Sequence, residues 1–266
     1  MSRSHWNEAA KIWQQIGEPL KPPGEALQHY AEAVSLWQGL EPRVLLMGVT
    51  QELFAFPWPS GTSISALDNS ADMIKNVWLG PPEAAFLGDW RDMPLTDGSF
   101  DLAVCDGGLT LLPYPEGHLQ VSRELSRILA ENGLCVFRLH ICPAAREEPA
   151  QVFAALAGGE IPDISHFKLR IAAAMQTDPE SGVVLADIWD ALIRFAPDLD
   201  ALAESIGWPI EHMRSIETYR GSANVYRFMT LEQIESVFPE FHLERVWRPT
   251  NPLQRMCPVA AFRKRT

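Results

Sequence analysis

Long apolar runs are missing from this sequence of 266 residues. A membrane-spanning helix needs about 20 consecutive apolar residues, and no stretch of the chain approaches that length. Near the amino terminus, Trp6, Glu8 and Lys11 interrupt the region where a secretory signal peptide would need an unbroken apolar core. We therefore expect a soluble, cytoplasmic protein that does not insert into membranes.

Basic residues are scarce. The chain has 22 Lys and Arg against 34 Asp and Glu, which gives a formal net charge of -12. Such a charge disfavours general affinity for nucleic acid and for anionic membrane surfaces, because both carry negative charge themselves. Hydrophobic residues make up 47% of the chain, enough for a sizeable core. We expect neither nucleic acid nor membrane as a partner, and the oligomeric state is left open.

Cysteine is also rare, and its spacing is uninformative for metal binding. No CxxC pair occurs, and no histidine lies near a cysteine at the spacing of metal ligands. Two of the cysteines lie inside apolar, strand-like runs. The sequence therefore predicts buried free thiols and no metal site. The four residues are Cys105, Cys135, Cys142 and Cys257.

The glycine-rich fingerprint of dinucleotide-binding enzymes is absent. An aliphatic run from Val44 to Met47 meets Gly48, as a buried parallel strand followed by a close backbone turn would. The next positions are Val49, Thr50 and Gln51 instead of further glycines. The missing GxGxxG counts against a nicotinamide-dependent oxidoreductase, and Gly48 alone is compatible with any strand end of an α/β protein.

Beyond this point, apolar strand-like runs alternate with helix-like segments. Alternation of this kind predicts a doubly wound, mostly parallel sheet, in which ligands bind at the carboxyl ends of the strands. Helices are expected at 51–56, 70–77 and 118–130, the last closed by the Glu-Asn-Gly signal at 131–133. The expected strands are 44–47, 63–67, 84–87, 101–105 and 134–139.

Four segments follow from this reading of the chain. Residues 1–42 form an N-terminal helical cap, or a flap over a ligand, and residues 43–140 form the α/β core. Residues 141–224 show helical periodicity without a persuasive strand, which indicates a helical insertion or lid. Residues 225–266 add a helix that Thr230 caps and a closing antiparallel hairpin.

Polar residues follow the predicted strands where a nucleotide-like ligand would need them. Asp68 could accept both hydroxyls of a ribose, or it could simply open the next helix. Asp89 could bind an adenine amino group while Trp90 lines the ring, or both could lie in a surface turn. Asp106 and Gly107 follow the fourth strand, where a glycine permits close backbone approach, or they form an ordinary tight turn.

Three blocks of sequence resemble class I S-adenosylmethionine-dependent methyltransferases. They are DNSADMI at 68–74, GDWRDMPLTDGSFDL at 88–102 and LSRILAENG at 125–133. The resemblance covers roughly residues 44–140 and is most specific in the middle block. It implies a Rossmann-like sheet of seven strands with the last one antiparallel, and S-adenosylmethionine bound across the first four strand ends.

The resemblance also implies which residues contact the cofactor. The family usually has an acidic residue at the end of the first strand and several glycines after it, and this chain departs from that pattern. Gly48 and its neighbours would meet the methionine part, and Thr50 could bind its carboxylate. The remaining residues are Asp68 for the ribose, Asn69 or Met73 for the ribose and adenine surroundings, Asp89 and Trp90 for the adenine, and Asp106 with Gly107 near the sulfonium.

Methyl transfer relies on positioning and needs a base only when the acceptor must lose a proton. His140, at the end of the fifth predicted strand, is the candidate base, although a lone histidine often has a structural role. The leading hypothesis is methyl transfer to a small-molecule acceptor bound between the strand ends and the helical insertion. The alternative is a catalytically inactive, methyltransferase-like binding or regulatory protein, which the altered Gly48 loop suggests.

Overall fold

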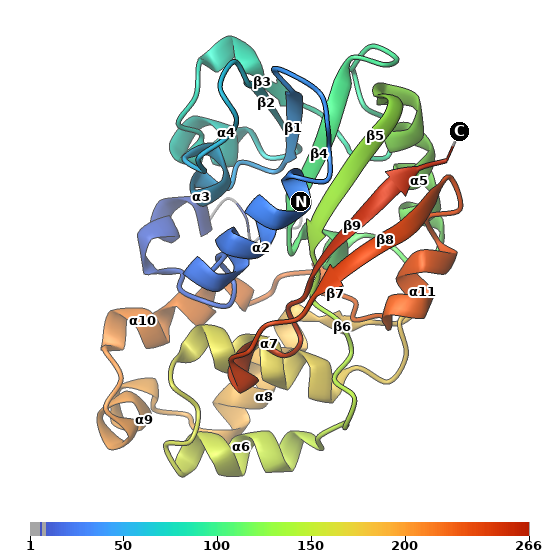
Figure 1. Ribbon diagram of the computed structural model, residues 1–266. Helices are drawn as coiled ribbons and strands as arrows, with labels where there is room; N and C mark the ends of the chain where they lie inside the picture. Colours follow the sequence, from blue (N-terminus) through green and yellow to red (C-terminus); the bar gives the residue numbers. More distant parts are fainter. Residues whose placement is uncertain (1–5, 7–8, 266) are drawn as a thin grey trace. The chain divides into compact units, whose positions relative to one another are not determined.

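The computed structural model describes residue 6 and residues 9–265 (Figure 1). The chain divides into two compact units. The helical unit comprises the residues up to Lys21 together with Cys142–Phe228, and the sheet unit comprises Pro22–Ile141 and the residues from Met229 onward. The residues before the first strand are therefore shared between the units. Among the described residues, no helix combines the length and apolarity needed to cross a bilayer.

A seven-stranded sheet forms the centre of the sheet unit, in the order β3-β2-β1-β4-β5-β9-β8. Strand β9 runs antiparallel to both of its neighbours, and the other pairings are parallel, which confirms the predicted fold class. The predicted closing hairpin is the β8–β9 pair at one edge. The strands are β1 Arg43–Met47, β2 Ser63–Asp68, β3 Ala85–Leu87, β4 Phe100–Asp106, β5 Leu129–Arg138, β8 Phe241–Trp247 and β9 Val259–Lys264.

Helices pack on the sheet and explain why its central strands are apolar on both faces. Leu125 and Ile234, from two different helices, belong to one cluster of buried side chains with Phe137 of β5. Another helix packs against β5 and β9 and buries Tyr30 completely. Burial on both sides is what a continuous aliphatic run such as that of β1 predicts. The helices are α2 Gly24–Val34, α3 Gln51–Phe54, α4 Ala71–Val77, α5 Glu116–Ile128 and α11 Leu231–Ser236.

The start of β5 differs from the sequence prediction. Helix α5 ends at Ile128, and the strand already begins at Leu129, where the sequence predicted helix up to residue 130. Leu129 pairs with Phe100 of β4, and its carbonyl accepts a hydrogen bond of 2.7 Å from Lys264 Nζ. Asn132 has a φ of +59°, so the predicted helix-ending signal is a left-handed residue inside the strand. Tertiary pairing overrides the local signal here.

The helical unit contains a small sheet that the sequence did not predict. Strands β6 Val183–Val184 and β7 Val225–Tyr226 pair antiparallel inside this unit. Strand β6 thus lies within residues 141–224, where the sequence shows no persuasive strand, and β7 belongs to the helical unit together with it. The other elements are the helices α6 Pro149–Ala157, α7 Ile164–Met175, α8 Leu185–Phe195, α9 Leu199–Ile206 and α10 Ile210–Arg214, with 3₁₀ segments at Ala10–Gln15 and Ser215–Tyr219.

Candidate functional site

The chain order of the sheet reverses between β1 and β4. Strand β1 pairs with β2 on one side and with β4 on the other (Figure 1). The chain therefore adds β2 and β3 on one side of β1, and then adds β4 and β5 on the other side. In open parallel sheets, ligands bind in the crevice outside the carboxyl ends of the strands at this switch point. The carboxyl ends of β1, β2 and β4 lie side by side here; Asp68 is the last residue of β2, and Gly48 and Gly107 directly follow β1 and β4.

Gly48 has a backbone conformation that favours glycine. Its φ is +97°, and its N–H donates to the Leu67 carbonyl over 2.9 Å. A methyl group in place of its α-hydrogen would lie 3.8 Å from Cζ2 of Trp90 and 3.9 Å from Oδ2 of Asp68. Both distances are ordinary van der Waals contacts, so the space beside Gly48 is bounded by these two side chains.

A short helix shapes the loop after Gly48, where the family usually has glycines. Thr50 precedes α3, and its side chain makes no capping hydrogen bond. The Gln51 side chain in the first turn of α3 donates to the Val77 carbonyl at the end of α4 over 2.9 Å. The loop is therefore tied to the neighbouring βα unit, and Thr50 stays a predicted contact of the ligand carboxylate.

Asp68 uses one carboxylate oxygen within its own loop. Oδ1 accepts the Ser70 N–H over 2.8 Å, and Ser70 Oγ in turn caps α4 by accepting the Met73 N–H. Burial raises the pKa of Asp68 to about 6. Its other oxygen is the one beside Gly48. Of the two neighbours named from sequence, Asn69 is exposed and Met73 is buried.

Asp89 lies in an ion pair within its own turn. Its Oδ2 lies 2.6 Å from Nη2 of Arg91, and Oδ1 accepts from Nε of the same side chain over 2.9 Å. The hydrogen bonds from Arg91 lower the pKa of Asp89, so the carboxylate is ionised at neutral pH. A carboxylate has about four acceptor positions, so this pair leaves capacity for a ligand amino group.

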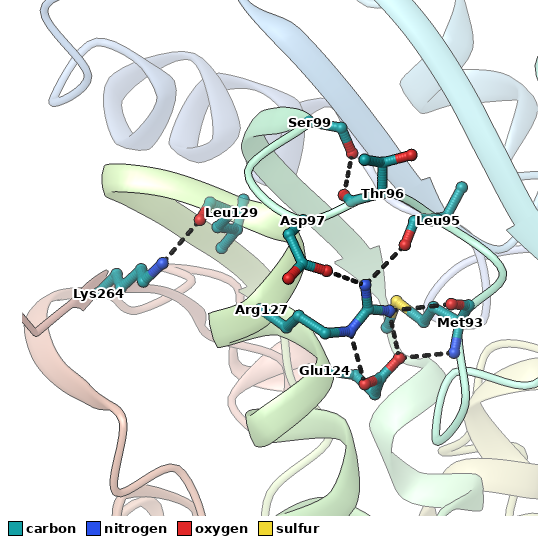
Figure 2. Close-up of polar contacts among 9 residues, drawn as sticks. All are labelled: Met93, Leu95, Thr96, Asp97, Ser99, Glu124, Arg127, Leu129 and Lys264. Atoms are coloured by element: carbon teal, nitrogen blue, oxygen red, sulfur yellow. Dashed lines mark hydrogen bonds and ion pairs between the residues drawn. The ribbon is translucent and has the colours of Figure 1, made fainter.

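Arg127 of α5 anchors the loop that follows this turn. Its guanidinium donates to the carbonyls of Leu95 and Met93 over 2.7 Å and 2.9 Å, and to Asp97 over 2.7 Å (Figure 2). Glu124, which also binds Arg127, accepts the Met93 N–H over 2.7 Å (Figure 2). The carboxyl side of the loop is thereby fixed to α5.

The indole of Trp90 lies across the switch point. Its Nε1–H donates to the Leu67 carbonyl over 2.8 Å, the same oxygen that accepts the Gly48 N–H. A methyl group on Gly108 would lie 2.5 Å from Cη2 of the indole, closer than side-chain carbons approach one another. The six-membered ring of the indole therefore packs against Gly108, and its Cζ2 edge is directed toward Gly48. The ring lies between the loop after β4 and the loop after β1.

Asp106 is fully engaged by other protein groups. Its Oδ2 accepts from Arg138 Nη2 over 2.8 Å, and both side chains are almost completely buried. Burial opposes the charge of Arg138, but the Asp106 carboxylate outweighs burial and raises the pKa of the guanidinium. The Tyr30 hydroxyl lies 3.1 Å from Asp106 Oδ1 and 2.9 Å from the Cys105 carbonyl. This ion pair gives the Asp106 carboxylate a structural role. Its contact with the sulfonium stays a prediction.

Arg138 and its pairing were missed by reasoning from the sequence. Asp106 and Arg138 are partners in register on adjacent parallel strands, at the last position of each. Each is a charged residue at the end of an aliphatic run. Two opposite charges at equivalent ends of neighbouring buried strands are the signal that could have revealed the pair.

His140 and Gly107 lie against each other. Gly107 has a φ of +68°, and a methyl group on it would lie 2.7 Å from Cε1 of the His140 imidazole. His140 is buried, with 7% of its surface exposed. The loops after β4 and β5 are therefore in direct contact, and this contact requires glycine at position 107. Across the described part of the chain, no cluster of three or more His, Cys, Asp or Glu side chains could hold a metal ion.

Comparison with known families gives a match over residues 45–137, to the family described as "Methyltransferase domain". This range begins within β1 and ends within β5, and it includes Gly48, Asp68, Asp89 and Asp106. No curated protein matches the chain.

Solved structures with the same fold cover nearly the whole chain. A Rhodobacter sphaeroides protein assigned as a Zn-dependent alcohol dehydrogenase is 16% identical, with a TM-score of 0.59 over 98% of this chain and 99% of its own. A Haloferax volcanii protein assigned as a methyltransferase, solved in complex with the Trm112 methyltransferase activator, is 14% identical, with a TM-score of 0.55 over 100% of both chains. A Methanococcus maripaludis protein assigned as an S-adenosylmethionine-dependent methyltransferase is 15% identical, with a TM-score of 0.50 over 100% of this chain and 96% of its own. At these identities the likeness shows a shared fold.

Proposed function

We propose that this chain, whose residues 45–137 match the methyltransferase-domain family, is a class I S-adenosylmethionine-dependent methyltransferase that transfers the methyl group of that cofactor to a small-molecule acceptor. The bound cofactor supplies a methyl group activated by a sulfonium. The protein has to orient the cofactor and the acceptor and exclude water, since an in-line displacement depends mainly on positioning.

The observation that carries the proposal is the pairing of Gly48 with Asp68 at the switch point. Gly48 lets the backbone approach a ligand closely, and Asp68 Oδ2 lies beside it, where we expect ribose hydroxyls to donate to it. The free space at the Gly48 α-carbon and the acceptor oxygen of Asp68 suit the chemistry of the cofactor. Asp89 is ionised and retains acceptor capacity for an adenine amino group. Thr50, Asn69 and Met73 keep the roles that the resemblance implies.

His140 is the side chain that we propose as the base, if the acceptor loses a proton. It follows β5 and packs on Gly107, so it stands at the loop after β4, next to the switch point. General acid–base catalysis needs a group within hydrogen-bond reach of the proton. Replacement of His140 by Gln tests this role, because glutamine can fill much of the same space but cannot take up the proton.

The charge of the chain supports a small-molecule acceptor over a nucleic acid. The formal net charge is -12, and several arginines that could bind phosphates are neutralised in ion pairs, including Arg43, Arg170 and Arg214. A protein that methylates RNA or DNA needs basic side chains to hold the phosphate backbone.

Transfer of a radiolabelled methyl group tests the acceptor class. Purified protein is incubated with methyl-labelled S-adenosylmethionine in three parallel reactions. One reaction contains a small-molecule extract, one contains transfer RNA, and one contains a protein fraction. We expect label to enter the small-molecule fraction. Label only in RNA or protein would contradict the proposal. Cofactor binding with no label in any fraction would instead favour the alternative, a binding or regulatory protein without transferase activity.

A further inference from the structure

The position of Trp90 conflicts with the entry of a ligand at the switch point. The crevice outside β1 and β4 is where a ligand of this sheet binds, and the indole lies in it. The ring rests on Gly108 after β4, and a methyl group on Gly48 after β1 would be in van der Waals contact with it, at 3.8 Å. The indole therefore takes up space beside both glycines, where a ligand of this sheet would approach the backbone.

We propose that the indole of Trp90 is a movable plug, which leaves the space between Gly48 and Gly108 when S-adenosylmethionine binds. The inference rests on the cofactor site of the proposed function and adds a residue that controls access to it. The cost of displacing the plug is part of every binding event, so Trp90 lowers the affinity of the protein for its cofactor.

A hydrogen bond and apolar packing hold the plug in place. Trp90 Nε1–H donates to the Leu67 carbonyl at the end of β2, and that oxygen also accepts the Gly48 N–H. Trp90 is half-buried and packs against the core cluster from one side of the sheet unit's loops, so it is not enclosed completely. Breaking one neutral hydrogen bond and giving up part of the ring's packing is a modest cost, comparable to about a tenfold change in an equilibrium constant.

The backbone on either side of Trp90 allows a local movement. The Gly88 N–H donates to the Asp68 carbonyl, which fixes the chain before the turn, and Arg127 fixes the loop from Met93 onward (Figure 2). Between these anchors lies a tight turn, closed by the hydrogen bond from Asp92 N–H to the Asp89 carbonyl. The plug can thus move as part of this turn while the sheet and α5 stay unchanged.

The competing interpretation is that the indole is a permanent wall on which the adenine stacks. The two interpretations predict opposite effects of removing the ring. If Trp90 is a plug, Trp90→Ala binds S-adenosylmethionine about tenfold more tightly than the wild type, because displacement no longer costs anything. If it is a wall, the same variant binds more weakly, because a stacking surface is lost.

Calorimetric titration with S-adenosylmethionine and with its demethylated product measures these affinities directly. Trp90→Phe retains a ring but loses the hydrogen bond to Leu67, so we expect an intermediate affinity. Trp58→Phe is the matched control, because Trp58 Nε1 also donates to a backbone carbonyl, that of Leu53, but does so between α3 and β2. The control should bind like the wild type, and thermal unfolding of each variant shows that it is folded.

Fluorine NMR of protein labelled with 5-fluorotryptophan reports the movement itself. The resonance that disappears in Trp90→Phe is that of Trp90. On addition of cofactor we expect this resonance to shift and to become more sensitive to exchange of H₂O for D₂O, while the Trp58 resonance stays in place. An unshifted Trp90 resonance with bound cofactor, or weaker binding by Trp90→Ala, would overturn the proposal. Absence of methyl transfer with tighter binding by Trp90→Ala would count only against the proposed function.

Discussion

Replacing Asp106 by alanine is expected to lower the free energy of unfolding by about 3–5 kcal/mol. The change leaves the guanidinium of Arg138 buried without its carboxylate, and removal of one partner of a buried ion pair typically costs this much. The effect acts on the fold, because the pair joins the ends of β4 and β5. Chemical denaturation followed by circular dichroism measures it.

An exposed ion pair provides the matched control for Asp106. Asp97 also pairs with an arginine, Arg127, but its side chain is 77% exposed, so Asp97→Ala should cost less than about 1 kcal/mol. Combining Asp106→Leu with Arg138→Met should restore much of the stability, since an apolar pair of similar volume can replace a buried ion pair. A loss below about 1 kcal/mol in Asp106→Ala would show that the ion pair does not hold the strand ends together.

Replacing Asp68 by asparagine is expected to weaken binding of S-adenosylmethionine by about 10- to 100-fold. A hydrogen bond to a charged group contributes about 1.5–3 kcal/mol, and asparagine keeps the shape of the side chain but loses the charge. The bond from Ser70 N–H to Oδ1 can persist in the variant. Calorimetric titration measures the affinity, and Asp72→Asn, which removes an equal charge from the first turn of α4, serves as the control.

The pKa of Asp68 gives this prediction a pH dependence. In the free protein burial raises this pKa to about 6, whereas ribose hydroxyls that donate to the carboxylate would lower it in the complex. Binding then requires loss of a proton below pH 6. The affinity of the wild type should therefore be constant above about pH 7 and fall by up to about tenfold per pH unit below pH 6. Asp68→Asn should show no such fall.

The same pKa predicts that Asp68→Asn is not destabilised. The folded protein raises the pKa from 3.8 to about 6, so it binds more protons than the unfolded chain between these values. The stability that protonated Asp68 contributes is present below pH 4 and is lost as the pH rises through 6. At pH 7.5 the ionised carboxylate is a cost, and the variant should melt at the wild-type temperature or above it. If Asp68→Asn has both a lower melting temperature and weaker binding, Asp68 stabilises the fold and its role in cofactor binding is contradicted.

The sheet was predictable because its central strands are buried on both faces. Val44–Met47 is a short aliphatic run bounded by polar residues, and such runs separated by helical segments predict a doubly wound sheet. The start of β5 was not predictable in this way. The signal at Asn132 is the same for a helix end and for a left-handed residue in a strand, and the pairing of Leu129 with Phe100 decides between them.

Strands β6 and β7 escaped prediction because each has two residues, too few for a periodicity to appear. Their pairing of Val183 with Tyr226 depends on tertiary contacts that join distant parts of the chain. The sequence-based start of the closing segment, at residue 225, also depended on the local sequence pattern alone. The sequence shows where apolar segments lie, and the contacts between them decide to which unit a short segment belongs.

The candidate site was predictable in position and not in its side-chain contacts. The sequence predicted that Gly48, Asp68 and Asp106 lie at the carboxyl ends of neighbouring parallel strands, and they do so in the structure. The direction of each side chain depends on partners far away in the sequence. Arg138 donates a hydrogen bond to the Asp106 carboxylate, and the Trp90 indole, which lies across the switch point, donates one to the Leu67 carbonyl.

Titration of the intact wild-type protein with S-adenosylmethionine, followed by calorimetry at pH 7.5, tests the central claim most directly. The Gly48 and Asp68 geometry predicts saturable binding of one cofactor per chain, competed by the demethylated product. Absence of heat and of any rise in melting temperature, in the wild type and in Trp90→Ala alike, would contradict the claim that the switch point between β1 and β4 holds this cofactor.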